Sequence, residues 1–280
     1  AIDNGVVYTE GGKDATYKIL ANTYFLMGTC YTEMALLFDQ CFLITETTDV
    51  ISITGESLVP ASSVQSAALD YLDKCISICE EKGDFANLSG MFPNNTMATG
   101  GKLKQLANFM AARCLAYFPR NKEEAATVDW NKVLGYAKNG LAEDIIATLP
   151  NNDYEQWTLV QNAAPTGGWV RIGMRILKMM CPNDANAKWP LPRDFGSTAT
   201  LPELNSPDHR LLTDFIYTPE HKSPSGTSFT GYTNYSPYSL NRFNDYATDG
   251  NGDEFLFTKV ESDLIYAEAL LNTRRTKPLP

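Results

Sequence analysis

The chain has 280 residues, 44% of them hydrophobic and 20% charged, and a formal net charge of −10. This composition is typical of a soluble globular protein, and the length suffices to bury one large core or two smaller ones. The acidic charge and the lack of a Lys/Arg-rich stretch disfavour nucleic acid as a partner, and no apolar run is long enough to span a bilayer. The chain opens Ala1-Ile2-Asp3, without the basic and apolar segments of a signal peptide; a signal removed earlier would leave the same start.

The six cysteines indicate buried thiols rather than a disulfide framework or a metal site. Five of them lie inside helical apolar patterns, and none forms a C-x-x-C motif. Cys75 and Cys79 share a helix face at i, i+4 spacing, which would suit a pair of metal ligands. The two histidines, His209 and His221, are far away in the sequence. Buried free thiols are the common outcome of such a pattern, so we expect no metal site and no cofactor.

Two long helices are predicted in the first third of the chain. The first runs from Asp14 to about Phe42, with the small residue Gly28 among its apolar positions. The second spans about 62–82 and ends at Gly83, because glycine readily takes the backbone conformation that follows a helix.

The stretch from Lys102 to Leu141 predicts two more helices, joined by a polar loop. Apolar residues recur at i, i+3/i+4 and i+7 on either side of Pro119, which stops the first helix. Asp129 is expected to cap the second helix, and Trp130 to be buried between the two. The pattern is that of a helix hairpin of tetratricopeptide size, although any antiparallel helix pair would produce it. With the helices before it, it favours an α-solenoid-like stack over a closed bundle.

The composition changes near Pro150. Residues 151–258 are rich in Pro, Gly, Asn, Ser, Thr and aromatic residues, and one helix is expected there, around Val170–Met180. The aromatic residues argue against disorder, and a loop region of this length is usually functional when it is ordered. Helical periodicity returns from Phe255 to Leu271, where four apolar residues share one face: Val260, Leu264, Ala267 and Leu271.

The sequence therefore predicts a mainly α protein, one domain overall, with a long loop-rich and aromatic-rich segment. Residues 1–150 are expected to form a tetratricopeptide-like scaffold of helix hairpins. Residues 151–258 are expected to form a ligand-facing segment packed on it, and residues 259–280 a helix that returns to the scaffold.

Enzyme signatures are absent from the sequence. There is no G-x-S-x-G, H-E-x-x-H, P-loop or strand-linked G-x-G-x-x-G motif, and no two carboxylates are fixed by their spacing. We therefore expect no catalytic residue. The run Asp249–Glu254 begins like a calcium loop, but Glu254 stands where the sharp turn needs Gly, and Val260 stands where the last ligand should be Glu. Calcium binding and a solvated turn both remain open.

The best candidate for a binding site is the run Gly231–Tyr238. Tyrosines on loops present flat apolar faces with a polar tip, which suits stacking on sugar rings or peptide planes. The candidate ligand-binding residues are Tyr232, Asn234, Tyr235 and Tyr238, with Trp157 from the same loop region. The alternative is that these rings pack the loop region onto the helices.

Several stretches spread along most of the chain form a recognisable series: Met34–Phe42, Ala112–Arg120, Val128–Ala137, Lys178–Asn183 with Lys188–Pro190, and Glu261–Ala269. In their order and spacing they resemble the SusD/RagB family of outer-membrane nutrient-binding lipoproteins. They are similar to the end of the family's long early helix, its central tetratricopeptide-like hairpin, a loop of one branch, and the helix after its variable loops. The family's lipid-bearing N-terminal cysteine and its last helices have no counterpart here, so we expect a chain incomplete at both ends.

The resemblance implies a non-enzymatic protein, lipid-anchored to the outer membrane and facing outward. It would cap a SusC-like TonB-dependent transporter and help to capture a glycan or a peptide for import. The helices would dock the transporter, and the loop region would supply the ligand surface. Ligand sites vary within the family, so no binding residue is transferred. The alternatives are a helical-repeat scaffold that binds only another protein, and a hydrolase whose carboxylates the sequence does not pair.

Overall fold

The computed structural model describes residues 5–89, 97–149, 171–189, 202–218, 236–241 and 252–275. Within these ranges the fold is mainly α-helical, and the strands form only two-stranded ribbons. The chain divides into two compact units. The first comprises Ala1–Ile146 and Phe255–Pro280, and the second comprises Ala147–Glu254.

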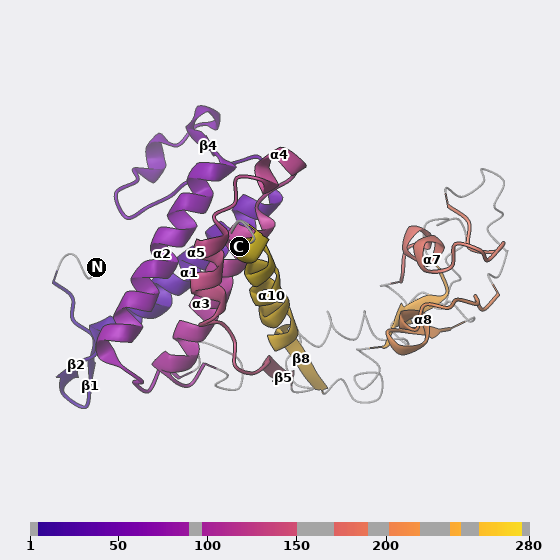
Figure 1. The fold of residues 1–280 in the computed structure, drawn as a ribbon. Coiled ribbons are helices and arrows are strands. Elements are labelled where there is room, and N and C mark those ends of the chain that lie inside the picture. Colours follow the sequence, from indigo (N-terminus) through magenta and orange to yellow (C-terminus); the bar gives the residue numbers. More distant parts are fainter. Residues whose placement is uncertain are drawn as a thin grey trace. The chain divides into compact units, whose positions relative to one another are not determined.

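The first unit is built mostly from helices (Figure 1). Its helices are α1 (Thr16–Leu37), α2 (Ala61–Lys82), α3 (Gly100–Tyr117), α4 (Lys122–Ala125), α5 (Trp130–Ala137) and α10 (Lys259–Arg275). Its short elements are β1 (Thr9–Glu10), β2 (Lys13–Asp14), β3 (Gln40–Phe42), β4 (Leu58–Pro60) and the 3-10 turns η2 (Val50–Ser52) and η3 (Gly55–Ser57). Strand β1 pairs antiparallel with β2, and β3 with β4.

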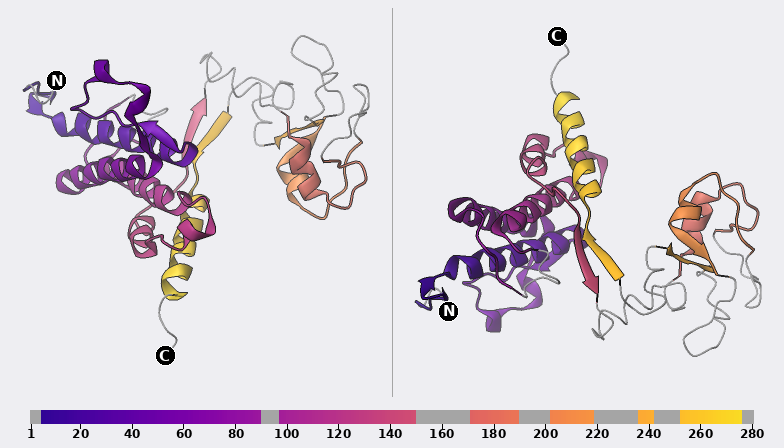
Figure 2. Two further views of the ribbon diagram at one scale, coloured as in Figure 1. Left: turned by 90° about the horizontal axis from the view of Figure 1, so that it is seen from above. Right: turned by 90° about the horizontal axis from the view of Figure 1, so that it is seen from below.

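Two further strands contain the boundaries between the units. Strand β5 (Ile145–Leu149) pairs with β8 (Gly252–Phe257), and both views of Figure 2 show the two strands side by side. The helix predicted from Phe255 is thus wrong at its start, because the alternation of Phe255 and Phe257 belongs to β8 and the helix begins at Lys259.

Helix α1 confirms the first predicted helix, but it ends at Leu37 rather than near Phe42. The residues after it pair with β4 as β3. Arg120 satisfies this helix end, because its Nη2 donates to the Phe38 carbonyl at 2.7 Å and its Nη1 bonds the Asp39 carboxylate. A cation beside the free carbonyls of a helix C-terminus is favourable.

Helices α1 and α2 pack closely because of one glycine. A Cβ on Gly28 would lie 2.6 Å from Cγ of Leu72 and 3.1 Å from the carbonyl oxygen of Ala68. Glycine at this position therefore sets the helix separation. Helix α2 confirms the second predicted helix. It ends at Lys82, directly before Gly83, whose φ of +69° is a conformation that favours glycine.

Helix α3 lies at the centre of the first unit. It contacts α1, α2, α5 and α10, so most of its circumference is covered. Its fully covered apolar side chains are Leu103, Leu106, Ala107, Met110, Ala111 and Cys114. These are the positions that the helical period predicts, and the first half of the predicted hairpin is confirmed.

The second half of that hairpin is shorter than predicted. Helix α5 ends at Ala137, and its N-terminus is capped as expected, with Oδ1 of Asp129 accepting two backbone N–H groups at 3.1 Å each. The prediction that Trp130 is buried between the two helices is wrong, because Trp130 is only half-buried. It is the first residue of α5, at the edge of the core, and Val133 one turn later takes the fully buried position.

Helix α10 returns to the α3–α5 pair through polar contacts. Oγ of Ser262 accepts the N–H of Leu141 at 3.1 Å, and Oε1 of Glu261 forms an ion pair with Nε of Arg113 at 3.1 Å. Ile265 and Ala269 supply its buried apolar contacts. The four apolar residues predicted to share a face do so, but they face away from this core: Val260, Leu264, Ala267 and Leu271 are all exposed.

Candidate functional site

The second unit has a small core of its own. It contains the helices α7 (Met174–Met180) and α8 (Arg210–Thr213) and the strands β6 (Phe215–Tyr217) and β7 (Tyr238–Leu240). Strands β6 and β7 pair antiparallel. The helix predicted around 170–180 corresponds to α7. The buried apolar residues that form the core of the second unit are Ile172, Met174, Leu177, Met180, Cys181, Ala187, Leu204, Leu211 and Tyr238.

The residues just before α7 run beside β7. The N–H of Ile172 donates to the carbonyl of Tyr238 at 2.9 Å, and the N–H of Ser236 donates to the carbonyl of Ile172 at 3.1 Å. Arg171 is thereby fixed next to the β6–β7 ribbon by backbone hydrogen bonds.

Of the predicted ligand-binding residues, four lie outside the described residues: Trp157, Tyr232, Asn234 and Tyr235. Tyr238 is described, and it is a core residue with 2% of its surface exposed. Its hydroxyl accepts the N–H of Leu204 at 2.7 Å, its ring lies 5.3 Å from that of Tyr217, and burial raises its pKa. Tyr238 in this position offers no free ring face to a ligand, because it packs within the core of its own unit.

Arg171 is the most unusual polar residue of this unit. Its side chain is buried, with 7% of the residue exposed. Nη1 donates to the hydroxyl oxygens of Thr218 and Ser239, whereas the buried Nε has no hydrogen-bond partner. Among the residues that the structure describes, no carboxylate forms an ion pair with it, and burial lowers the pKa of its guanidinium.

The Thr218 hydroxyl beside Arg171 is oriented by the backbone. Oγ1 of Thr218 donates to the carbonyl of Pro237 at 2.9 Å, which leaves its lone pairs for the guanidinium. Sequence reasoning missed this cluster. The available signal was an arginine within the apolar run Trp169–Met174, but the sequence does not show that its side chain is enclosed.

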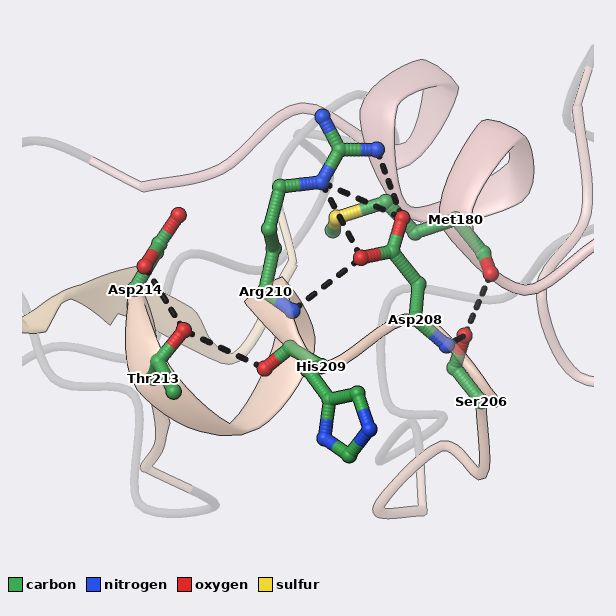
Figure 3. A network of polar contacts seen from close by, with 7 residues as sticks. All are labelled: Met180, Ser206, Asp208, His209, Arg210, Thr213 and Asp214. Atoms are coloured by element: carbon green, nitrogen blue, oxygen red, sulfur yellow. Dashed lines mark hydrogen bonds and ion pairs between the residues drawn. The ribbon is translucent and has the colours of Figure 1, made fainter.

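A second polar cluster precedes and includes α8 (Figure 3). Asp208 accepts hydrogen bonds from Nε of Arg210 at 3.0 Å and from Nη2 at 2.6 Å. The hydrogen bonds from Arg210 lower the pKa of Asp208 to about 2. Ser206 joins this cluster to α7, because its Oγ bonds the Met180 carbonyl and accepts the Asp208 N–H at 3.0 Å.

This second cluster has a structural role. A carboxylate held ionised by a forked arginine is a poor proton donor or acceptor at neutral pH. Thr213, at the end of α8, contacts the His209 carbonyl at 3.2 Å and the Asp214 carboxylate at 2.8 Å, so its contacts stay within the same turn. The His209 ring is exposed and takes no part in this network (Figure 3).

The potential metal ligands do not gather in the described parts of the chain. No three Cys, His, Asp or Glu residues come together there. All six cysteines are free, and Cys30 is exposed whereas the other five are buried. Cys75 and Cys79 do lie together in the core, where the hydrogen bond between them and burial raise the pKa of Cys75. Of the calcium-like run, Asp253 lies in β8, and residues 249–251 lie outside the described ranges.

Within the ranges that the structure describes, no helix combines the length and the apolar character needed to cross a membrane. No known protein family, curated protein or solved structure matches this chain. Its function is therefore argued from its residues and their geometry.

Proposed function

We propose that this chain is a SusD-like nutrient-binding protein. In this proposal it is held on the outer face of the outer membrane by a lipid anchor, works with a SusC-like TonB-dependent transporter, and binds a glycan or a peptide without catalysis. The observation that supports it is the insertion of one compact unit, Ala147–Glu254, between two parts of the helical unit.

The insertion follows from the contacts of α10. This helix comes after the whole second unit in the chain, yet it packs against α3 and α5. The helical unit therefore needs chain segments from both sides of the insert, because α10 follows the insert in the sequence. Binding residues are commonly carried on loops that a rigid scaffold positions. Helix α1 packs on α2, and α3 packs on α5, and the proposal takes these contacts as successive helix pairs of a tetratricopeptide-like scaffold.

The proposed ligand surface lies in the loops of the insert. Tyr232, Tyr235 and Trp157 supply rings for stacking, and Asn234 supplies hydrogen bonds. Pro237 restricts the adjoining backbone, which lowers the cost of ordering the loop on binding. A surface of this kind binds uncharged sugars with modest affinity and little dependence on salt, because no ion pair is involved.

A panel of soluble glycans and peptides tests the proposal on the intact chain. The variant Tyr232→Ala/Tyr235→Ala should abolish binding of the ligand found, whereas Tyr266→Ala, on α10, should bind normally. Tyr238 is left unchanged because it is a core residue. Normal binding by the double variant would place the site elsewhere, and turnover of the ligand would favour a hydrolase.

A second candidate function is that of a scaffold that binds only another protein. The observation that favours it is the row of exposed apolar side chains on α10, formed by Val260, Leu264 and Leu271. Purified SusC-like transporter provides the test. A complex that is lost in Leu264→Lys, together with no binding to any member of the ligand panel, would favour the scaffold.

A further inference from the structure

Among the residues that the structure describes, the guanidinium of Arg171 has hydrogen-bond partners on one side only. Both of its hydrogen bonds, to Thr218 and to Ser239, are made by Nη1. The other edge, formed by Nε and Nη2, makes no hydrogen bond to any described residue, and Nε is buried. That edge presents two parallel N–H groups, which is the geometry that matches the two oxygens of a carboxylate.

Three of the carboxylates that the structure describes in this unit have partners other than Arg171. Asp208 is held by Arg210, and Asp214 is contacted by Thr213. Asp184 accepts the N–H groups of two other residues. A buried cation without a counter-charge is costly, so an anion that reaches it gains a strong, weakly screened interaction.

We propose that Arg171, with the hydroxyls of Thr218 and Ser239, forms a binding site for the carboxylate group of a small ligand. The Nε–Nη2 edge holds the two carboxylate oxygens. The hydroxyls of Thr218 and Ser239 accept from Nη1 and hold the guanidinium in place, so that its other edge remains for the ligand. A carboxylate suits this site better than a phosphate dianion, because one negative charge balances one guanidinium.

This site goes beyond the proposed function, because its ligand carries a charge and need not be a glycan. The carboxylate can come from an acidic sugar or from the C-terminus of a peptide, and the same chemistry recognises both. The site itself accepts either source, so the choice between the two ligand classes is left to the probes in the experiment.

The experiment measures binding to the full chain by calorimetry at constant ionic strength and neutral pH. The probes are glucuronate and N-acetylalanine, with glucose and N-acetylalanine amide as their neutral counterparts. At least one carboxylate should bind more tightly than its neutral counterpart, and the stronger of the two identifies the source. Arg171→Met should weaken that binding about tenfold or more. Arg175→Met is the matched control, because Arg175 is exposed on α7, and its affinity should equal that of the wild type.

Two further measurements guard against a folding defect. Arg171→Lys keeps the charge but loses the fork, and it too should bind about tenfold more weakly. In the wild-type chain, nuclear magnetic resonance should show the Arg171 Nε–H signal moving downfield as the carboxylate is added. Equal binding of charged and neutral probes, normal affinity in Arg171→Met, or an unmoved Nε–H signal would overturn the proposal. If the tyrosine double variant loses binding to a neutral glycan and Arg171→Met keeps it, the proposed function is supported even where the carboxylate site is refuted.

Discussion

The two units each bury one long cationic side chain among the described residues, and they treat it differently. In the helical unit, Lys18 is 6% exposed and pairs with Glu10, whose pKa is lowered mainly by the hydrogen bond from Lys18. In the inserted unit, Arg171 is 7% exposed and finds only hydroxyl groups. The charge of Lys18 is compensated by a carboxylate of the same chain. A charge that lacks its counter-charge leaves room for a ligand to supply one.

The cores of the two units also differ, in their size and in the polar residues buried with them. The helical unit has a continuous core that joins α1, α2, α3, α5 and α10. The core of the inserted unit is smaller, and the serines Ser236 and Ser239 are buried beside it. We infer that the first unit provides the rigidity and the second the ligand contacts. The substitutions that follow test how each unit is held together, from the largest expected effect to the smallest.

Phe109→Ala should cause the largest loss of stability. Phe109 is 1% exposed, and its ring meets that of Phe257 edge-on at 5.8 Å. Truncation of a buried phenylalanine costs about 3–5 kcal/mol of unfolding free energy. The measurement is urea unfolding followed by circular dichroism. Phe38→Ala, at a ring that is 55% exposed, is the control and should change stability by no more than about 0.5 kcal/mol. Equal effects of the two variants would contradict the proposed core.

Gly28→Ala should destabilise the helical unit by about 1–3 kcal/mol through overpacking. The added methyl group would meet Leu72, which is fully buried and cannot move outward. Gly135→Ala is the matched control, because, apart from the neighbouring backbone of its own helix, no atom lies within 4 Å of a Cβ at that position. It should stabilise the protein by up to about 1 kcal/mol, since alanine favours a helix over glycine. Thermal unfolding compares the two, and a stabilising Gly28→Ala would refute the close approach of α1 and α2.

The sequence predicts the helices of the scaffold well because each repeats one local pattern. Helices α1, α2 and α3 follow the apolar period, and the Asp129 cap follows from the side chain's own chemistry. The sequence fails where a distant partner decides the outcome. Strands β3 and β8 need their partners β4 and β5, which no local period encodes. The apolar face of α10 is a further example, because Ile265 and Ala269 are buried although the wider stripe faces outward.

The candidate site could be predicted less well, for a related reason. In the sequence, Tyr238 resembles the tyrosines of a ligand-binding loop. Only the fold reveals that its hydroxyl accepts a hydrogen bond from the Leu204 N–H. Arg171 looks like an ordinary charged residue until the burial of its side chain is known. Whether a polar side chain serves packing or binding depends on what encloses it, and that is a property of the tertiary structure.

Asp129→Ala should cost about 0.5–2 kcal/mol of stability, the usual value of a helix N-cap. The substitution leaves the N–H groups of Asn131 and Lys132 without their carboxylate acceptor. Asp129→Asn keeps a side-chain oxygen at the same place and should lie within a few tenths of a kcal/mol of the wild type. Urea unfolding distinguishes the two variants, and equal losses would mean that the charge at this helix end matters more than the cap.

The smallest expected effect concerns the second unit and appears only in acid. The hydrogen bonds from Arg210 lower the pKa of Asp208 from its ordinary value of 3.8 to about 2. A carboxyl group with a lowered folded-state pKa stabilises the fold above its unfolded-state pKa, and this contribution is lost as the pH falls through the folded-state value. The stability difference between the wild type and Asp208→Asn should therefore be constant above about pH 5 and shrink towards pH 2. Because Arg210 is largely exposed, solvent screens the pair and the effect is small.

A titration of the Asp208 carboxyl carbon by nuclear magnetic resonance checks the premise directly, with Arg210→Gln as the variant that should return its pKa towards 3.8. Titration of wild-type Asp208 near its ordinary value would mean that the Asp208–Arg210 fork does not persist in solution, and that the turn before α8 is held by Ser206 and the backbone alone.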